Sequence, residues 1–334
     1  MTTFKEISGQ LIRTLSSDPA NPQEGQIWYN STIGVLKGYQ NIGGAWAAGG
    51  NVNTARHRVG SAGLQTAALL FGGTSGFQTE SYDGASWTSL ANMSRGTGNQ
   101  MGAGAGTQTA ALGFGGYGPP GMNTASESWD GTSWTATNSL NTGRASGGGA
   151  GTQASALFFG GYQILPPGNT YGSFANTESW NGTSWTTVNS MGQTRTGPAG
   201  VGLQTAALSI GGMNPIPSAG LTNTEEYDGT NWTAGGSLGT GRYGGGASSS
   251  GTTSAALFFG GSSPVPTKGN LTESYDGTSW TTAATMATAR YELGGFGTQT
   301  AALAASGSPG AGPASNATEE FTNPTIAVQT IDTN

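Results

Sequence analysis

Six glutamates recur along the chain at intervals of 47, 51, 47, 48 and 46 residues, and an aromatic residue follows each of them two positions later. Two carboxylates that face one cleft can act as general acid and base, for example in glycoside hydrolysis. Such catalysis needs an asymmetric pair, whereas one glutamate per repeat produces a symmetric set. We therefore predict structural roles for Glu80, Glu127, Glu178, Glu225, Glu273 and Glu319.

Arginines recur in step with these glutamates, once per repeat, at Arg56, Arg95, Arg144, Arg195, Arg242 and Arg290. A guanidinium and a carboxylate can satisfy each other, and a carboxylate can also accept hydrogen bonds from backbone N–H groups. Either arrangement would make the repeated residues part of the scaffold. The sequence therefore predicts no catalytic residue among them.

Other reactive groups are scarce. The chain has no cysteine and a single histidine, His57, which excludes thiolate nucleophiles, cysteine metal sites and multi-histidine sites. We expect His57 to be structural or exposed, and we predict no metal and no cofactor. The stretch SYDGTSW comes within one residue of the sialidase Asp-box, Ser-x-Asp-x-Gly-x-x-Trp, but its Gly and Trp arrive one position early. That box is a turn element, so the near match does not identify catalysis.

The composition indicates a folded protein that carries few charges. Gly supplies 61 of 334 positions and only 8% of residues are charged, but nine Trp, ten Tyr and eleven Phe provide apolar area that disordered segments lack. Because the net charge is -6 and the basic residues are scattered, we expect no nucleic-acid partner. The amino terminus lacks the apolar core of a secretory signal, and no stretch reaches transmembrane length, so we expect no membrane insertion.

Two alternating phrases define the repeat. Near-copies of TESYDGTSWTT (residues 272–282) each follow an apolar phrase such as GTQTAALGFGG, which ends at Gly116. Each period thus holds four strand-like runs, of the types GRASGGGAG, QTAALFF, TESYD and SWT, separated by Gly-Gly and Asp-Gly turn signals. This pattern is typical of a β-propeller blade, in which Gly and Ala suit the crowded inner strand. Structural roles in the wider outer part are predicted for Trp87, Trp134, Trp185, Trp232 and Trp280.

The order of an Arg, small residues, an apolar run with Gly-Gly, then Tyr and Trp resembles the kelch repeat over residues 54–326. The resemblance implies an all-β, kelch-like propeller of four-stranded blades, and it says little about function because kelch propellers serve as enzymes, scaffolds and adhesins. Copper oxidase chemistry, known in some kelch propellers, needs a cysteine and histidine ligands. This chain cannot supply them.

We expect a short N-terminal arm followed by a single propeller domain. The strand candidates QIWYN, VLKGY and AW, with Tyr39 and Trp46 mimicking Tyr82 and Trp87, are interpreted as an irregular blade that the C-terminal residues complete. Seven blades are favoured, and six blades with the N-terminal hairpin packed outside the ring is the alternative. The predicted segments are the arm (1–24), the propeller (25–334), and within it the irregular blade (25–53), six kelch-like repeats (54–328) and the C-terminal closure (329–334).

The loops that follow each Gly-Gly differ in length from repeat to repeat and hold Pro and apolar residues, whereas the hairpin turns hardly vary. Variable loops on a rigid scaffold are common recognition sites, although these side chains could also pack on one another as a lid. The predicted binding residues on this loop face are Tyr117, Met122, Ile164, Leu165, Tyr171, Phe174, Met213, Ile216, Val265 and Lys268.

The stretch LSSDPANPQEGQIWYNSTIGVLKGY resembles a phrase near the start of structural proteins of tailed phages, particularly marine ones. The resemblance implies a virion protein, such as a tail fibre, tail-associated or head-decorating protein, assembled in the host cytoplasm. We expect it to be non-enzymatic and to bind other virion proteins through the arm or the loop face, or a host surface glycan; a homo-oligomer stays open. The alternatives are a sialidase-like glycan-degrading enzyme and an intracellular kelch interaction scaffold.

Overall fold

The computed structural model describes ten segments, residues 12–19, 26–40, 44–94, 102–118, 121–165, 170–214, 219–263, 269–310, 313–323 and 327–330. All regular elements in these segments are strands, which form seven four-stranded and two two-stranded sheets. Within the same segments, no helix has the length and apolar character needed to cross a membrane. The chain divides into two compact units, Ala45–Thr322 and a smaller one that combines Met1–Gly44 with Asn323–Asn334.

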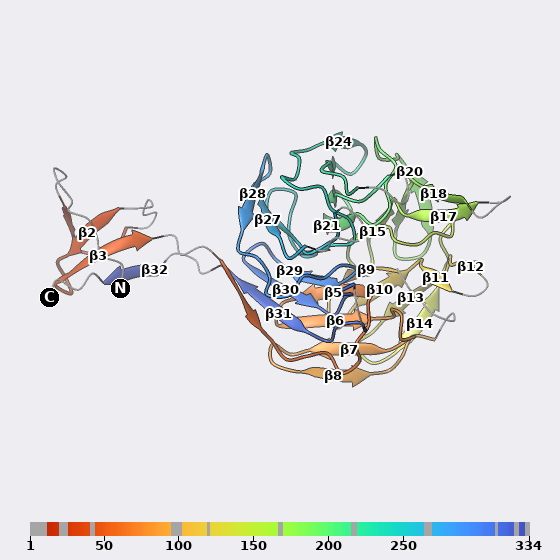
Figure 1. The fold of residues 1–334 in the computed structure, drawn as a ribbon, viewed down its shortest axis with the longest axis horizontal. Helices are drawn as coiled ribbons and strands as arrows, with labels where there is room; N and C mark the ends of the chain where they lie inside the picture. The colour runs from red at the N-terminus through yellow and green to blue at the C-terminus, as the bar shows by residue number, and fades with distance from the viewer. Residues whose placement is uncertain are drawn as a thin grey trace. The chain divides into compact units, whose positions relative to one another are not determined.

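The larger unit is a propeller of six four-stranded antiparallel blades (Figure 1). The first three blades, each given from its inner to its outer strand, are β5 (Gly60–Leu64), β6 (Ala67–Phe71), β7 (Thr79–Tyr82), β8 (Trp87–Leu90); β9 (Ala103–Gly106), β10 (Ala111–Phe114), β13 (Ser126–Trp129), β14 (Trp134–Thr137); and β15 (Gly148–Gly151), β16 (Ala156–Phe159), β19 (Thr177–Trp180), β20 (Trp185–Val188). The other three are β21 (Ala199–Leu203), β22 (Ala206–Ile210), β23 (Thr224–Tyr227), β24 (Trp232–Ala234); β25 (Gly246–Ala247), β26 (Ala256–Phe259), β27 (Thr272–Tyr275), β28 (Trp280–Ala283); and β29 (Gly294–Gly297), β30 (Ala301–Ala305), β31 (Thr318–Thr322), β4 (Ala45–Ala48).

The ring closes with six blades. The predicted all-β, kelch-like propeller is confirmed. Its blade count is six, the alternative, rather than the favoured seven. Each inner strand contacts the next around the axis, and β29 contacts β5. The sixth blade takes its outer strand from the N-terminal side of the chain, where Trp46 of β4 pairs with Phe321 of β31. Trp46 therefore does act as a repeat tryptophan, as its likeness to Trp87 predicted. It does so in the sixth blade because the sixth repeat lacks a tryptophan of its own.

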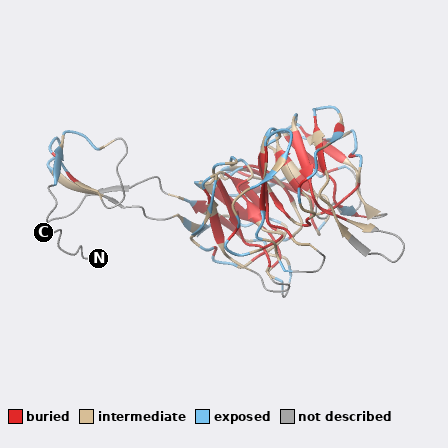
Figure 2. Cartoon of the chain, turned by 90° about the horizontal axis from the view of Figure 1, so that it is seen from above, coloured by how far each residue is buried: buried red, intermediate tan, exposed pale blue. Residues whose placement is uncertain are grey.

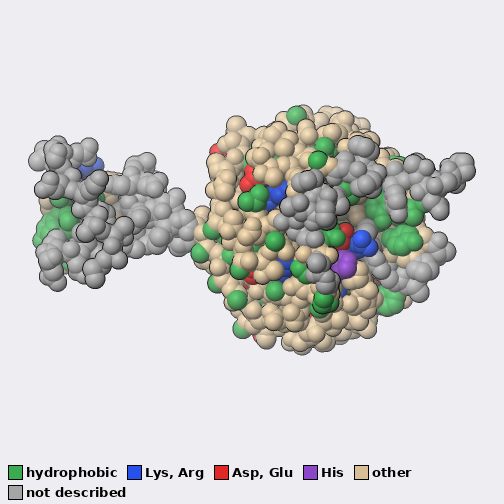
Figure 3. Space-filling model, in the orientation of Figure 1, with side chains coloured by type: hydrophobic (Ala, Val, Ile, Leu, Met, Phe, Trp, Pro, Cys, Tyr) green, Lys and Arg blue, Asp and Glu red, His purple; other side chains and the backbone are tan. Residues whose placement is uncertain are grey.

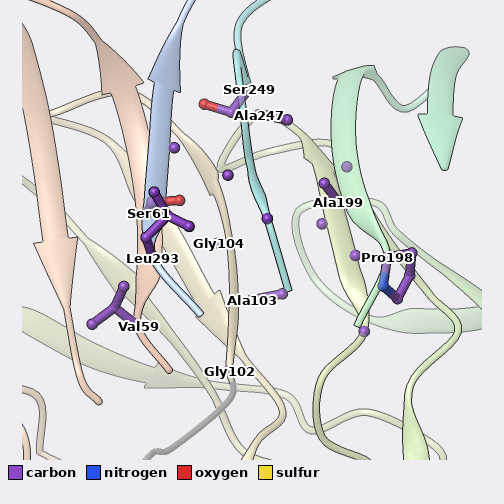
Figure 4. A pocket seen from close by; sticks show the side chains of 17 residues that line it. Val59, Ser61, Gly102, Ala103, Gly104, Pro198, Ala199, Ala247, Ser249 and Leu293 are labelled. Carbon is purple, nitrogen blue, oxygen red and sulfur yellow. The ribbon is translucent and has the colours of Figure 1, made fainter. Parts of the chain in front are cut away.

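Glycine lines the axis because the inner strands approach one another backbone to backbone. A Cβ on Gly200 would lie 2.1 Å from the carbonyl oxygen of Gly149 in the neighbouring blade, and one on Gly295 would lie 2.3 Å from the nitrogen of Ala247. Figure 4 shows the pocket that remains at the axis, which is lined mostly by glycine and by small side chains such as those of Ala103 and Ser61. The crowding that the sequence predicted for the innermost strand is confirmed.

Tryptophans join the blades at their outer ends. The indole N–H of each repeat tryptophan donates to a hydroxyl on the third strand of the preceding blade, at 2.8–3.0 Å, for example from Trp134 to Thr79. Even the join between blades six and one has this bond, from Trp87 to Thr318. Figure 2 shows the buried residues concentrated on the strands and the exposed ones at the turns. The predicted structural role of the tryptophans agrees with these contacts.

The smaller unit is a four-stranded sheet in the order β1 (Arg13–Leu15), β2 (Ile27–Asn30), β3 (Val35–Gln40), β32 (Ala327–Thr330). An N-terminal and a C-terminal segment therefore pair, since β3 runs antiparallel to β32, but this sheet is not a blade of the ring. The Asp18 carboxylate accepts hydrogen bonds from the buried Trp28 indole (3.1 Å), from Asn30 (2.9 Å) and from Lys37 (2.6 Å). Part of the predicted arm is thus a paired strand, and residues 1–11 and 20–24 of it lie outside the described residues.

Two short hairpins extend the loops that follow the Gly-Gly pairs of blades two and three. They are β11 (Tyr117–Gly118) with β12 (Gly121–Met122), and β17 (Tyr162–Leu165) with β18 (Thr170–Ser173).

Substituting an axial glycine should destabilise the ring. In Gly200→Ala the new methyl group would overlap the Gly149 carbonyl, so we expect a loss of at least about 1–3 kcal/mol in the free energy of unfolding, the usual cost of overpacking. Gly121→Ala is the matched control, since no heavy atom of the described residues lies within 4 Å of its added Cβ. Urea unfolding of both variants measures the difference, and equal stabilities would show that the inner strands can separate.

Candidate functional site

The repeated glutamates and arginines form buried ion pairs within the blades. In the five blades where both residues are described, an arginine at the blade entry binds the glutamate on the third strand; N···O distances are 2.5 Å for Arg144–Glu178 and 2.9 Å for Arg290–Glu319. The other three pairs are Arg56–Glu80, Arg195–Glu225 and Arg242–Glu273. All these arginines are at most 1% exposed. Arg95 lies outside the described residues.

Backbone groups complete each of these pairs. The carboxylate of Glu178 accepts from the N–H of Asn141 (2.7 Å) in the segment that enters its blade, while Arg144 donates to the carbonyl oxygens of Phe158 and Gly160 (both 3.0 Å). Burial lowers the pKa of the five described arginines, and the partner glutamate opposes this effect. The pairs hold the blade entry against its sheet, which supports the predicted scaffold role and leaves no carboxylate of this set facing a cleft.

A chain of backbone hydrogen bonds runs around the axis through the five blades in which the bonding position is described. The residue two positions after the repeated arginine donates its backbone N–H to the carbonyl oxygen of the equivalent residue in the preceding blade. Such bonds run from Gly244 to Gly197 (2.9 Å), from Gly197 to Ser146 (2.7 Å) and from Arg58 to Glu292 (2.9 Å). All five described residues at this position have a left-handed backbone, with φ between 53° and 67°. Two of them are glycine, which adopts this conformation freely, but Arg58, Ser146 and Glu292 carry side chains there.

These residues surround a cavity of about 270 Å³ at the mouth of the axial channel. It is lined by Arg58, Ser146, Tyr162, Thr196, Gly197, Met213, Tyr243, Gly244, Tyr291 and Glu292. On the face that Figure 3 presents, the purple side chain of His57, the single histidine, lies beside blue and red side chains. The symmetric ring thus acquires one asymmetric polar cluster, between blades one and six. The sequence analysis missed it.

Glu292 is the central charged group of this cluster. Its Oε2 atom accepts a hydrogen bond from Nε of Arg58 at 3.0 Å, and Nε2 of His57 lies 3.7 Å from the same oxygen. Burial raises the pKa of the Glu292 carboxyl, and Arg58 opposes the rise. Burial and the charge of Arg58 lower the pKa of His57, so its imidazole is neutral near pH 7. Tyr243, whose pKa is raised chiefly by burial, stands edge-on to Tyr291 with ring centroids 6.4 Å apart.

The predicted loop-face residues are only partly described. Met213 lines the cavity, Tyr117 is exposed opposite Met122 in the β11–β12 hairpin, and Ile164 and Phe174 are partly buried. Leu165 and Tyr171 belong to β17 and β18, but their side chains are not among those described, and Ile216, Val265 and Lys268 lie outside the described residues. Binding by this set remains a prediction.

A comparison of the repeats with one another would have revealed the missed residues. The residue two positions after the arginine is Gly in repeats four and five, but Arg58, Thr97, Ser146 and Glu292 in repeats one, two, three and six. Glycine in some copies indicates a left-handed backbone, so a side chain in other copies is costly and points to a special role. Among the described residues, no group of three or more Asp, Glu or His side chains is arranged to hold a metal ion.

The fold resembles that of a solved protein, YjhT. The two chains superimpose with a TM-score of 0.69 at 15% sequence identity, over 84% of this chain and 99% of YjhT. No protein-family model matches the sequence, and no curated protein matches it. At this identity the likeness establishes the kelch-like propeller fold alone.

This likeness corrects the expectation of a non-enzymatic protein. YjhT shares the propeller fold, and propellers of this kind serve enzymes as well as binding proteins, so the fold gives no ground for a non-enzymatic protein. The lack of an asymmetric carboxylate among the repeated glutamates had supported the expectation. Glu292, which lies outside that set, removes this support.

Breaking one buried ion pair should be costly. Glu178→Gln leaves the Arg144 guanidinium buried without a counter-charge, and we expect a loss of about 3–5 kcal/mol in the free energy of unfolding. Asp130→Asn is a control that also removes one carboxylate. Its turn position is occupied by Asn181 in the next blade, with the same two backbone hydrogen bonds, so the change should stay within about 0.5 kcal/mol. Similar losses in both variants would contradict the scaffold role of the pair.

The raised pKa of Glu292 should be visible in the pH dependence of stability. In the unfolded protein the pKa of this carboxyl is near 4.5, and in the folded protein it is higher. The protonated acid therefore favours folding at low pH. This contribution to stability is lost as the pH rises through the folded-state pKa. Compared with Glu292→Gln, the wild type should therefore lose stability from about pH 4.5 towards neutrality. Urea unfolding across this range tests it. If the wild type instead gains stability relative to Glu292→Gln as the pH rises, the attraction of Arg58 outweighs the effect of burial on the pKa of Glu292.

Proposed function

We propose that this protein is a carbohydrate-binding propeller of a virion and that the mouth cavity holds the glycan. The observation that carries the proposal is the left-handed backbone of Arg58, Ser146 and Glu292. A non-glycine residue in this conformation costs about 1–3 kcal/mol, and such strain concentrates at functional sites. All three residues line the same cavity.

The remaining cavity lining is suited to a sugar. Tyr162, Tyr243, Tyr291 and Met213 supply aromatic and apolar surface, while Arg58, Glu292, Ser146 and Thr196 supply a few polar groups. Apolar walls with a small number of placed polar groups are typical of small-ligand sites, and amphipathic tyrosines suit a ligand with one apolar and one polar side. A sugar ring has both.

The virion setting rests on the N-terminal phrase. Its Asp18, Trp28, Asn30 and Lys37 bind one another, which indicates that the phrase encodes a small folded sheet. We assign to this smaller unit the docking to another virion protein, and to the propeller the contact with the glycan. Assembly in the host cytoplasm and binding to a host surface belong to the same proposal.

Glycoside hydrolysis is a second candidate for the same cavity. Burial raises the pKa of Glu292, which is the direction expected for a general acid. Most glycoside hydrolases use a second carboxylate, and Glu292 is the only acidic residue among the described cavity-lining residues. Binding is therefore the better supported function, and release of reducing sugar from a bound polysaccharide would establish the second.

Glu292→Gly should separate binding from folding. Glycine is the native residue at this ring position in two other blades, so we expect stability to be unchanged or raised by about 1 kcal/mol, while affinity for the glycan falls at least tenfold. Binding to immobilised host polysaccharides and a glycan array, alongside thermal unfolding, measures both effects.

Ser306→Gly is the matched control, because Ser306 is also left-handed but lies outside the cavity. It should keep full affinity. If Glu292→Gly binds as well as the wild type, the cavity is not the site, and a wild type that binds no glycan refutes the proposed function.

A further inference from the structure

We infer that the glycan is electrically neutral, with a hydroxyl group donated to the free side of the Glu292 carboxylate, and that sugars bearing a carboxylate are rejected. This inference rests on the proposed function and names the ligand class of its site. It follows from the charges around the cavity, the bonds that Glu292 makes, and the size of the space.

The charges lining the cavity cancel. Among the described lining residues, Arg58 and Glu292 are the charged ones, and they are bonded to each other at 3.0 Å. His57, beside them, is neutral near pH 7 because its pKa is lowered by burial and by the charge of Arg58. A sugar carboxylate would enter a mostly buried site whose cation already has a counter-charge. Burying a charge without a partner is strongly unfavourable.

The carboxylate itself selects for hydroxyl donors. Its Oε2 atom faces Arg58 and His57, whereas no described group bonds Oε1. A carboxylate is an acceptor only, so it binds an O–H group and repels another carboxylate. Neutral sugars carry several hydroxyl groups, one of which can donate to Oε1 while the C–H face of the ring lies against Tyr243 or Tyr291.

The cavity is small for an extended ligand. Its volume of about 270 Å³ lies just under the roughly 300–1,000 Å³ of pockets that enclose drug-sized molecules. One sugar unit of a chain therefore fits at the mouth, and the rest would lie across the loop face.

Matched sugar pairs test the inference. Neoglycoconjugates of glucose, galactose and mannose are compared with those of glucuronic, galacturonic and mannuronic acid, and neutral oligosaccharides with their sialylated forms. The wild type should bind at least one neutral member, at least tenfold more tightly than its acidic counterpart. Glu292→Gln should weaken the binding of neutral sugars. It should also reduce the ratio of neutral-sugar to acidic-sugar affinity to less than threefold, because the charge that repels the acidic sugar is gone. Asp130→Asn, which removes a carboxylate that is not part of the cavity lining, should leave the ratio unchanged.

The outcomes separate the two proposals. Equal or tighter binding of the acidic sugars by the wild type would overturn neutral selection while leaving glycan binding in place. An unchanged ratio in Glu292→Gln would also overturn it, since another group would then make the choice. If no sugar in either set binds, the proposed function fails and this inference fails with it.

Discussion

The close approach of six inner strands around one axis is the constraint on which the rest of this structure depends. At Gly200 and Gly295 the backbones of neighbouring blades come so near that a single methyl group would collide with a peptide unit. Side chains are therefore excluded from the centre, and nearly all large ones lie in the wedges between blades. The high glycine content, which by itself resembles a linker, is the condition for packing the ring.

Since the centre is built from backbone, the blades must be held together further out. The tryptophan bonds to the preceding blade do this in all six blades, while the buried arginine–glutamate pairs hold the entry of a blade against its own sheet. A glutamine that recurs in most repeats adds another join: Gln108 donates to the carbonyl oxygens of Ala68 and Tyr82 in the preceding blade. The fifth repeat has Thr253 in place of this glutamine, so the join between blades four and five lacks that contact. Residues that repeat are thus explained by the ring alone.

Repetition also determined how much could be predicted. The blades, their strand order, the structural glutamates and the loop face follow from a sequence whose copies confirm one another. The count of blades did not follow, because Trp46 has the features of a repeat residue whether its strand closes blade six or begins a seventh. Only long-range pairing, between β4 and β31 and between β3 and β32, settles that question. The cavity was missed for a related reason: Arg58 and Glu292 are 234 residues apart, and their meeting depends on ring closure.

Left-handed residues help to separate what the fold requires from what it tolerates. Ser306 occupies a position that is glycine in the other repeats, but its hydroxyl bonds to the Arg56 carbonyl, so the substitution is absorbed within the scaffold. At the mouth, by contrast, Gly197 and Gly244 show that the ring needs no side chain at all. Arg58 and Glu292 depart from glycine there and place an ion pair where a ligand can reach it. Ser306 replaces glycine for a reason that lies within the scaffold. Arg58 and Glu292 have no such reason, and their replacement of glycine therefore points to recognition.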